Sequence, residues 1–300
     1  MILTMPTTLQ SGTQILYTIS TDHIRIRDPF VVADRASMQY YLFGTTDADP
    51  WNGVGIGFQV YRSRDLKLWS EPEYAFRPPE GFWGTKNFWA PEVHHYEGSW
   101  YLIASFYAEN RHRGVHIFRS GQITGPYVPI SGSPATPEDW DCLDGTLYVE
   151  ENTPWLVFSH EWTQIQNGAI CALPLAKDLS KATGAPATLF HAKDAPWIVP
   201  DTGDVVVAKG ENYVTDGPFL FHEDGKLKML WSSFAADGYA IGIAESRTGK
   251  LTGPWTQQKA PAFDFGGHGM LFDAFDGTRY LVLHAPNTSG QERLRFVRWN

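Results

Sequence analysis

The chain has 300 residues, 43% hydrophobic and 14% aromatic, enough to build one large folded domain. Its net charge of -9, without any run of Lys and Arg, argues against nucleic acid and anionic membranes as partners. No apolar stretch approaches the roughly 20 residues needed to span a bilayer. We expect a soluble protein, either cytoplasmic or secreted with its leader removed, and the sequence leaves the compartment unknown.

Short runs rich in β-branched and aromatic residues, bounded by Gly, Asp, Asn and Pro, follow one another along the whole chain. They fall into successive units of three strands. Each unit opens with a short apolar strand that carries an acidic residue or a His near its start. The opening strands are predicted at residues 28–32, 90–94, 144–148, 216–220 and 267–271.

One degenerate phrase recurs after the third strand of these units. Its copies lie at residues 63–69, 119–127, 175–180 and 245–255. Repetition at a period of roughly fifty residues is typical of radial β-propellers. The sequence therefore predicts an all-β fold, a five-bladed β-propeller that forms a single domain over residues 1–300, with the opening strands around a central channel.

The N-terminal segment, residues 1–23, precedes the first unit. The fifth unit ends near its third strand at the C-terminus, which leaves one place in its sheet unfilled and one strand edge exposed. Residues 14–19 have the composition of a strand. We predict that this strand fills the fifth sheet and closes the ring.

Four motifs on the opening strands carry the chemistry. They are Arg27-Asp28-Pro29, Trp89-Ala90-Pro91-Glu92-Val93, Asp144-Gly145-Thr146-Leu147 and Gly267-His268-Gly269. An Asp before Pro or Gly is usually only a turn residue that bonds its own backbone. The recurrence of such residues near the start of successive blades instead favours a role at the channel for Asp28 and Asp144, whereas Glu92 is expected to be structural.

In these motifs the chain resembles glycoside hydrolase family 43 over residues 24–299. The resemblance implies a five-bladed propeller that hydrolyses glycosidic bonds with inversion. It assigns Asp28 as the general base and Asp144 as the carboxylate that raises the pKa of the acid. Inversion needs a base and an acid on opposite faces of the sugar, about 6.5 to 9.5 Å apart, and strands that face each other across a channel can supply this separation.

The position of the acid departs from the family pattern. The family has a Glu before Gly-Pro or Ala-Pro, whereas this chain has Asp216 before Gly217-Pro218, one methylene shorter. Either Asp216 is the acid with the sugar seated differently, or Glu161 replaces it, or the chain binds sugars without cleaving them. We favour Asp216, because the sequence that follows it is intact.

Other side chains near the motifs are expected to contact the sugar. Phe30, Trp89 and Trp162 are candidates for stacking, although packing between blades explains most aromatic residues. His160 and Arg293 are candidates for hydroxyl contacts. Because residues two apart on a strand share a face, Arg293 and Arg295 should both point inward or neither should. His268 is expected to face the channel, beside water or a structural Ca²⁺ or other cation, and the chemistry itself requires no cofactor.

The resemblance thus implies a hydrolase of arabinofuranosyl or xylosyl linkages in plant cell-wall polysaccharides or oligosaccharides, of the α-L-arabinofuranosidase or β-xylosidase type. A catalytically silent carbohydrate-binding propeller is an alternative from another class. An endo-acting arabinanase or xylanase, an exo-galactofuranosidase and a galactanase are alternatives on the same fold. Retaining fructan and sucrose hydrolases are disfavoured, because the chain lacks both a Trp-Met-Asn-Asp strand and a Glu followed by Cys.

Overall fold

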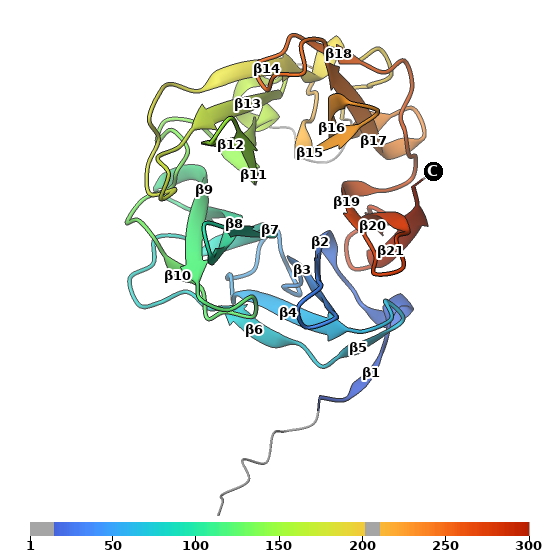
Figure 1. Cartoon of the computed structure of the whole chain (residues 1–300). Coiled ribbons are helices and arrows are strands. Elements are labelled where there is room, and N and C mark those ends of the chain that lie inside the picture. The colour runs from blue at the N-terminus through green and yellow to red at the C-terminus, as the bar shows by residue number, and fades with distance from the viewer. Residues whose placement is uncertain (1–14, 202–210, 300) are drawn as a thin grey trace, which may run out of the picture.

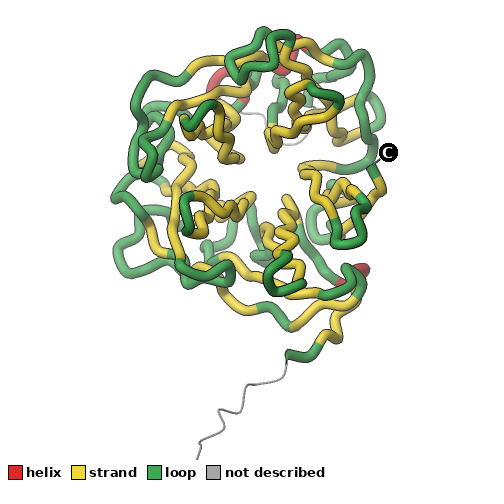
Figure 2. Tube along the Cα trace, in the orientation of Figure 1, coloured by secondary structure: helices red, strands yellow, loops and turns green. Residues whose placement is uncertain are grey.

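The computed structural model describes residues 15–201 and 211–299 of the chain. Its strands form five antiparallel sheets, which stand around a central channel as the blades of a propeller (Figure 1). Figure 2 shows that strands and loops make up nearly the whole ring, with only short helical segments. The predicted all-β fold with five blades is confirmed. Within the described residues, no helix is long and apolar enough to cross a membrane.

The blades follow one another in chain order, and the first strand of each is innermost (Figure 1). Blade one contains β2 (Arg27–Asp34), β3 (Gln39–Thr45), β4 (Phe58–Ser63), β5 (Leu68–Ser70) and β6 (Glu73–Phe76). Blade two contains β7 (Lys86–Tyr96), β8 (Ser99–Ala108), β9 (Arg111–Ser120) and β10 (Val128–Pro129). Blade three contains β11 (Cys142–Glu150), β12 (Thr153–His160), β13 (Ala169–Pro174) and β14 (Ala187–His191).

Blade four contains β15 (Asp216–Glu223), β16 (Lys226–Ala235), β17 (Gly238–Ser246) and β18 (Trp255–Gln257). Blade five contains β19 (Gly267–Asp273), β20 (Arg279–Ala285) and β21 (Arg293–Arg298). The remaining elements are β1 (Tyr17–Ser20) and the short helical segments η1 (Thr21–His23), α1 (Trp162–Ile165) and η2 (Ala192–Asp194).

Two-residue turns join the first and second strands of the three middle blades. Both residues of each turn have positive φ, with values of 45° and 73° at Glu97-Gly98, 49° and 65° at Glu151-Asn152, and 52° and 73° at Asp224-Gly225. Positive φ at both central positions defines the type I′ turn, whose twist matches that of the strands it joins. These turns therefore fix the hairpin registers and, with them, the side chains that face the channel.

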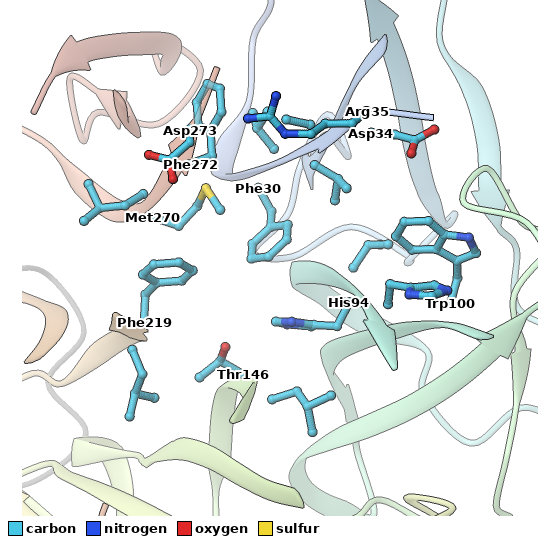
Figure 3. Close-up of a pocket in the computed structure, with 18 residues that line it drawn as sticks. Phe30, Asp34, Arg35, His94, Trp100, Thr146, Phe219, Met270, Phe272 and Asp273 are labelled. Atoms are coloured by element: carbon cyan, nitrogen blue, oxygen red, sulfur yellow. The ribbon is translucent and has the colours of Figure 1, made fainter. Parts of the chain in front are cut away.

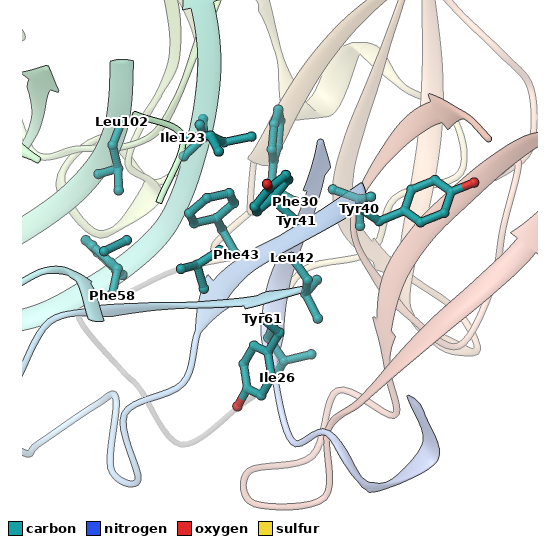
Figure 4. Close-up of a cluster of buried hydrophobic side chains, with 14 of the residues drawn as sticks. Ile26, Phe30, Tyr40, Tyr41, Leu42, Phe43, Phe58, Tyr61, Leu102 and Ile123 are labelled. Atoms are coloured by element: carbon teal, nitrogen blue, oxygen red, sulfur yellow. The ribbon is translucent and has the colours of Figure 1, made fainter. Parts of the chain in front are cut away.

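The hydrophobic core lies between neighbouring blades. Figure 4 shows part of the largest cluster, in which Phe43, Phe58 and Leu102 lie close together on blades one and two. Phe58 packs edge-on against Phe106, with ring centroids 5.8 Å apart. It also packs against Phe76, whose ring is tilted and has its centroid 6.0 Å away. Packing between blades thus occupies many of the aromatic side chains, as expected.

The prediction that residues 14–19 fill the fifth sheet is wrong. Gln14 lies outside the described residues, and the strand that forms here, β1, pairs antiparallel with β5 of blade one, with Tyr17 opposite Ser70. Two further bonds hold the segment to the same blade, from Thr21 N–H to the Lys67 carbonyl at 3.0 Å and from Trp69 Nε1 to Thr21 Oγ1 at 2.9 Å. The nearby edge of β5 therefore captures the strand, and among the described residues the fifth sheet keeps three strands.

Individual contacts between blades five and one close the ring instead. The Leu294 N–H donates to the Ile24 carbonyl at 3.3 Å, and the Phe275 N–H donates to the Tyr40 hydroxyl at 2.9 Å. Glu292, whose side chain is 0% exposed, accepts a hydrogen bond from Arg27 at 3.0 Å. We call this junction the closing seam.

The innermost strands share a β-bulge near their starts. The register with the second strand shifts after Arg27, Trp89, Leu143, Asp216 and Gly267. In four blades the next residue has positive φ, namely 50° at Asp28, 47° at Ala90, 55° at Asp144 and 54° at Gly217. Because Asp tolerates this left-handed conformation better than most residues, the bulge can present a carboxylate to the channel.

The backbone N–H group at the bulge is hydrogen-bonded by the preceding blade of the ring. The three bonds to the second strand of that blade run from Asp28 to His284 Nδ1 at 3.1 Å, from Ala90 to Thr45 Oγ1 at 2.9 Å, and from Asp144 to Ser105 Oγ at 2.8 Å. The bulge of blade four departs from this pattern. Its Gly217 N–H donates to Asp144 Oδ2 of blade three at 3.0 Å, rather than to Ser159 on the second strand of that blade. Within the described residues, the Ser159 hydroxyl has no hydrogen-bond partner.

Ser105→Ala should therefore destabilise the protein more than Ser159→Ala. Both serines are fully buried at equivalent positions, but only the first substitution leaves a buried N–H group unpaired, at Asp144. We expect Ser105→Ala to lower the free energy of unfolding by about 1–3 kcal/mol, and Ser159→Ala to change it little. Urea unfolding of both variants tests this difference, and equal losses would contradict the role given to the bond.

Candidate active site

A cavity of about 550 Å³ lies at the end of the channel where the innermost strands begin. Asp28 on β2, Asp144 on β11, Asp216 on β15 and His268 on β19 all line it. Four blades thus each contribute an ionisable side chain from the start of their inner strand, and blade one adds Arg27. The structure brings together the three carboxylates and the His that the motifs single out.

Asp28 is held on both its backbone and its carboxylate. Its N–H bonds His284, its Oδ2 accepts a hydrogen bond from Thr45 Oγ1 at 2.8 Å, and its Oδ1 lies 3.6 Å from His268 Nδ1. Burial would raise the pKa of Asp28, but His268 and Arg27 outweigh it and hold the pKa below its ordinary value. Asp28 is therefore ionised at neutral pH, as a general base must be.

His284 fixes the backbone of Asp28 as a neutral imidazole. Burial, followed by the nearby Arg27, lowers the pKa of His284 to about 3. Its Nδ1 accepts the Asp28 N–H, so its proton lies on Nε2, which is 3.2 Å from Asn287 Oδ1. The tautomer is thus set by its two partners, Asp28 and Asn287, both of which line the cavity.

His268 joins Asp28 to Asp144. Its Nδ1 lies 3.4 Å from Asp144 Oδ2 and 3.6 Å from Asp28 Oδ1. Burial would lower the pKa of His268, but Asp144 and then Asp28 raise it to about 9. The imidazole is consequently cationic at neutral pH, and its charge offsets part of the repulsion between the two carboxylates.

Asp144 also connects to the strand that carries Asp216. Its Oδ2 accepts a hydrogen bond from the Gly217 N–H at 3.0 Å, one residue beyond Asp216. Burial, followed by the charge of Asp144, raises the pKa of Asp216 to about 8. Asp216 therefore keeps its proton at neutral pH, which is the state required of a general acid.

Asp216 occupies a different position on its strand from the other two aspartates. Asp28, Asp144 and His268 each follow the residue that pairs before the bulge, whereas Asp216 is itself that residue and pairs with Ser232. Gly217 takes the bulge position in blade four. Because successive side chains on a strand point to opposite sides, this offset of one residue makes Asp216 enter the cavity from a different direction than Asp28 and Asp144 do.

Glu161, the alternative acid, also lines the cavity. Its Oε2 accepts a hydrogen bond from Arg113 Nε at 3.0 Å. The same guanidinium donates to Asn87 Oδ1 at 3.0 Å and lies 4.1 Å from the ring centroid of Trp89. Glu161 thus belongs to a wall of paired charges, and one of its oxygens is already bound.

Two of the residues expected to bind sugar line this cavity and three do not. Trp89 and Trp162 face it. His160 instead stacks on Trp140, with ring centroids 4.1 Å apart, and its Nε2 lies 2.7 Å from Gln164 Oε1. Arg293 donates hydrogen bonds to the Gly290 and Glu292 carbonyls, and Arg295 lies 3.2 Å from Asp22. We expected both arginines to point inward or neither, and neither faces the cavity.

Phe30, the third candidate for stacking on the sugar, does not line the cavity that contains Asp28. Phe30 lines a second cavity of about 590 Å³, and Figure 3 shows it there with Phe219, Met270 and His94. Its ring packs 5.2 Å from that of His94. Phe30 lies two residues beyond Asp28 on β2, after the bulge and further along the channel. Glu92, which was expected to be structural, has its Oε2 2.8 Å from His94 Nε2.

The sequence analysis gave no role to several residues that line the cavity. Among them are Arg27, Trp51, Asn87, Arg113, Tyr239 and Asn287. Arg27 stands in the first motif and Asn87 lies two residues before Trp89 on β7, so both had a usable signal. The others reach the cavity from third strands or from loops, where only the three-dimensional ring brings them near the carboxylates.

The donor set beside His268 does not fit a metal site built from protein ligands. Among the described residues, no group of three or more His, Cys, Asp or Glu side chains is arranged to hold a metal ion. The imidazole already faces two carboxylates through Nδ1. The cation expected beside His268 stays a prediction.

Two characterised proteins are similar to the chain in sequence. The chain is 23% identical to the extracellular endo-α-(1→5)-L-arabinanase 1 of Bacillus subtilis (strain 168) over 265 residues, 83% of this chain and 72% of that protein. It is 25% identical to α-L-arabinofuranosidase 43 of Humicola insolens over 188 residues, which are 60% of this chain and 37% of that protein.

The fold is also shared with solved structures. The crystal structure of an endo-arabinase from Bacteroides thetaiotaomicron VPI-5482 superposes with a TM-score of 0.87 at 38% identity, covering 95% of this chain and 98% of that one. The family model of the glycosyl hydrolases family 43 matches residues 20–298. The chain therefore belongs to glycoside hydrolase family 43.

Proposed function

We propose that the chain hydrolyses α-L-arabinofuranosyl linkages of arabinan, acting within the polysaccharide chain. The observation that carries the proposal is the cavity in which an ionised Asp28 and a protonated Asp216 meet, within a family of inverting glycoside hydrolases. The choice of arabinan rests on the 38% identity to a protein described as an endo-arabinase. Action at chain ends is the second candidate, favoured by the similarity to an α-L-arabinofuranosidase.

In this proposal the reaction proceeds in one displacement. Asp28 takes a proton from a water molecule, which attacks the anomeric carbon from one face of the sugar. Asp216 gives its proton to the glycosidic oxygen, which leaves with the electron pair of the broken bond. Asp144 does not exchange a proton with the sugar and acts by keeping Asp216 protonated. The rings of Trp89 and Trp162 supply apolar surface for the sugar.

The first test identifies the substrate and the stereochemistry. Proton NMR during hydrolysis of linear arabinan and arabino-oligosaccharides should show the β-anomer as the initial product, because displacement at an α-linkage inverts the anomeric carbon. Fragments of intermediate length should appear before arabinose. The α-anomer as first product would contradict inversion. Sugar binding with no more release than by an Asp28→Ala variant, on arabinosides, xylosides and galactofuranosides alike, would favour the silent carbohydrate-binding alternative.

The second test separates the two candidate acids. Asp216→Asn should lower kcat on arabino-oligosaccharides by about 10²–10⁴-fold, because the leaving oxygen would depart without a proton. Glu161→Gln should lower it far less, since Arg113 already occupies one Glu161 oxygen. Steady-state kinetics of both variants at one pH decide the matter, and the reverse order of effects would transfer the acid role to Glu161.

The third test concerns pH. Activity should fall as the pH rises through about 8, because Asp216 must be protonated and its pKa is raised to about 8. The charge of Asp144 contributes to this raised pKa, so Asp144→Asn should lower the pKa of Asp216 and move the alkaline limb to lower pH. The pH dependence of kcat/KM measures the shift. An unmoved alkaline limb would show that Asp144 has another role.

A further inference from the structure

Tyr239 is a cavity residue that has no part in the proposed reaction. It is the second residue of β17, on the third strand of blade four, and its side chain lines the cavity although the residue is only 6% exposed. Its ring stacks on that of His284, with centroids 6.0 Å apart and 25° between planes, and packs against Phe234 at 5.3 Å. These contacts fix the direction of its hydroxyl group.

The neighbouring blade leaves room for this ring. A Cβ atom at Gly267 would lie 2.4 Å from Tyr239 Cε1 and 2.7 Å from Cδ1, closer than any real contact. Gly267 is the inner-strand residue that pairs before the bulge of blade five. The equivalent residues of the other four blades are Arg27, Trp89, Leu143 and Asp216, all of which carry side chains. The glycine before His268 thus accommodates Tyr239.

The phenol bonds the carboxyl group of Asp216. Tyr239 Oη donates to Asp216 Oδ2 at 2.8 Å, and among the described residues this is the one side-chain hydrogen bond that the Asp216 carboxyl receives. Burial, and then Asp216, Asp144 and Asp28, raise the pKa of Tyr239 well above its ordinary value. The phenol is therefore a permanent donor, and an acid that accepts it at Oδ2 has Oδ1 free to carry the proton.

We propose that Tyr239 is a positioning residue for the general acid, holding Oδ2 of Asp216 so that Oδ1 presents its proton to the glycosidic oxygen. The inference rests on the proposed role of Asp216. Asp216 has one rotatable bond fewer than a glutamate, so a single hydrogen bond and the bulge beside it suffice to fix its orientation. Proton transfer is sensitive to placement on the scale of an ångström, which gives this bond its effect on rate.

The proton balance gives Tyr239 a second effect on the same step. The proton passes from Asp216 Oδ1 to the glycosidic oxygen as the bond between that oxygen and the anomeric carbon breaks, and the bonding electrons stay on the oxygen. Water attacks the anomeric carbon and gives a proton to Asp28. Tyr239 keeps its own proton, and its hydrogen bond to Oδ2 stabilises the carboxylate that Asp216 becomes, since bonds to charged acceptors are stronger.

The test compares Tyr239→Phe with Asp216→Asn on aryl arabinotriosides that carry dinitrophenyl, nitrophenyl or phenyl leaving groups. Dinitrophenolate departs without a proton, whereas the poorer leaving groups need acid assistance. Tyr239→Phe should lower kcat on the phenyl substrate by about 10–100-fold and on the dinitrophenyl substrate by less than about threefold, with KM nearly constant. Asp216→Asn should show the same trend more steeply.

Tyr127→Phe is the matched control. Tyr127 is also a buried tyrosine, and its hydroxyl donates a hydrogen bond of 2.8 Å to the Ile123 carbonyl, away from the cavity. This variant should lose stability without any dependence on leaving group, and circular dichroism establishes that each variant is folded at the assay temperature. Equal loss of kcat by Tyr239→Phe on all three substrates, or a change in KM alone, would overturn the proposal.

The design separates this inference from the proposed substrate. If the wild-type protein cleaves no arabinoside, the same comparison is made with aryl xylosides and galactofuranosides, so the arabinan assignment fails while the role of Tyr239 is still measured. Absence of hydrolysis in every series would overturn both. A steep leaving-group dependence in Glu161→Gln rather than in Asp216→Asn would overturn the role of Tyr239, because its partner would not be the acid.

Discussion

The bulge near the start of each inner strand is the constraint on which the rest of the molecule depends. It places Asp28 and Asp144 in a left-handed backbone conformation and turns one N–H group of the strand toward the adjacent blade. The acceptors for those N–H groups lie on second strands, so catalytic geometry and blade packing share the same hydrogen bonds. A blade that moved relative to its neighbour would therefore rotate a carboxylate.

The charges at the channel follow from this crowding. Three carboxylates cannot all be ionised in a small buried space, and the structure gives them different states through different neighbours. His268 lies between Asp28 and Asp144, whereas Asp216 receives a hydrogen bond from a neutral phenol. The base and the acid thus differ in their surroundings although they have the same side chain, and the two protonation states that inversion requires coexist at one pH.

The sequence predicted the ring and the residues at its centre because short local sequence patterns indicate both. The repeated strand starts and turns gave the five blades, and Asp28, Asp144, Asp216 and His268 all lie in one cavity as expected. The errors concern directions and partners that no local pattern contains. Phe30 stands two residues from Asp28 but faces the other cavity, because the strand runs along the channel from one end toward the other.

The sequence also did not reveal the partners of residues that lie outside the inner strands. The strand near the N-terminus could have filled the open place in the fifth sheet, yet it pairs with the edge of β5 in blade one. Tyr239 and Arg113 enter the cavity from third strands, and nothing in their own sequence context distinguishes them from other residues of a β-strand. Their roles depend on glycines and charges that are distant in the chain, such as Gly267 and Glu161.

The closing seam joins the last blade to the first. Among the described residues, blades five and one are held by separate side-chain and backbone contacts and share no strand, and Asp28 and His284 lie on this junction. A glycan that fills the cavity contacts groups on both sides of the seam, including Asp28 and Asn287. A sugar bound there would therefore add contacts across the seam to those that the protein itself supplies.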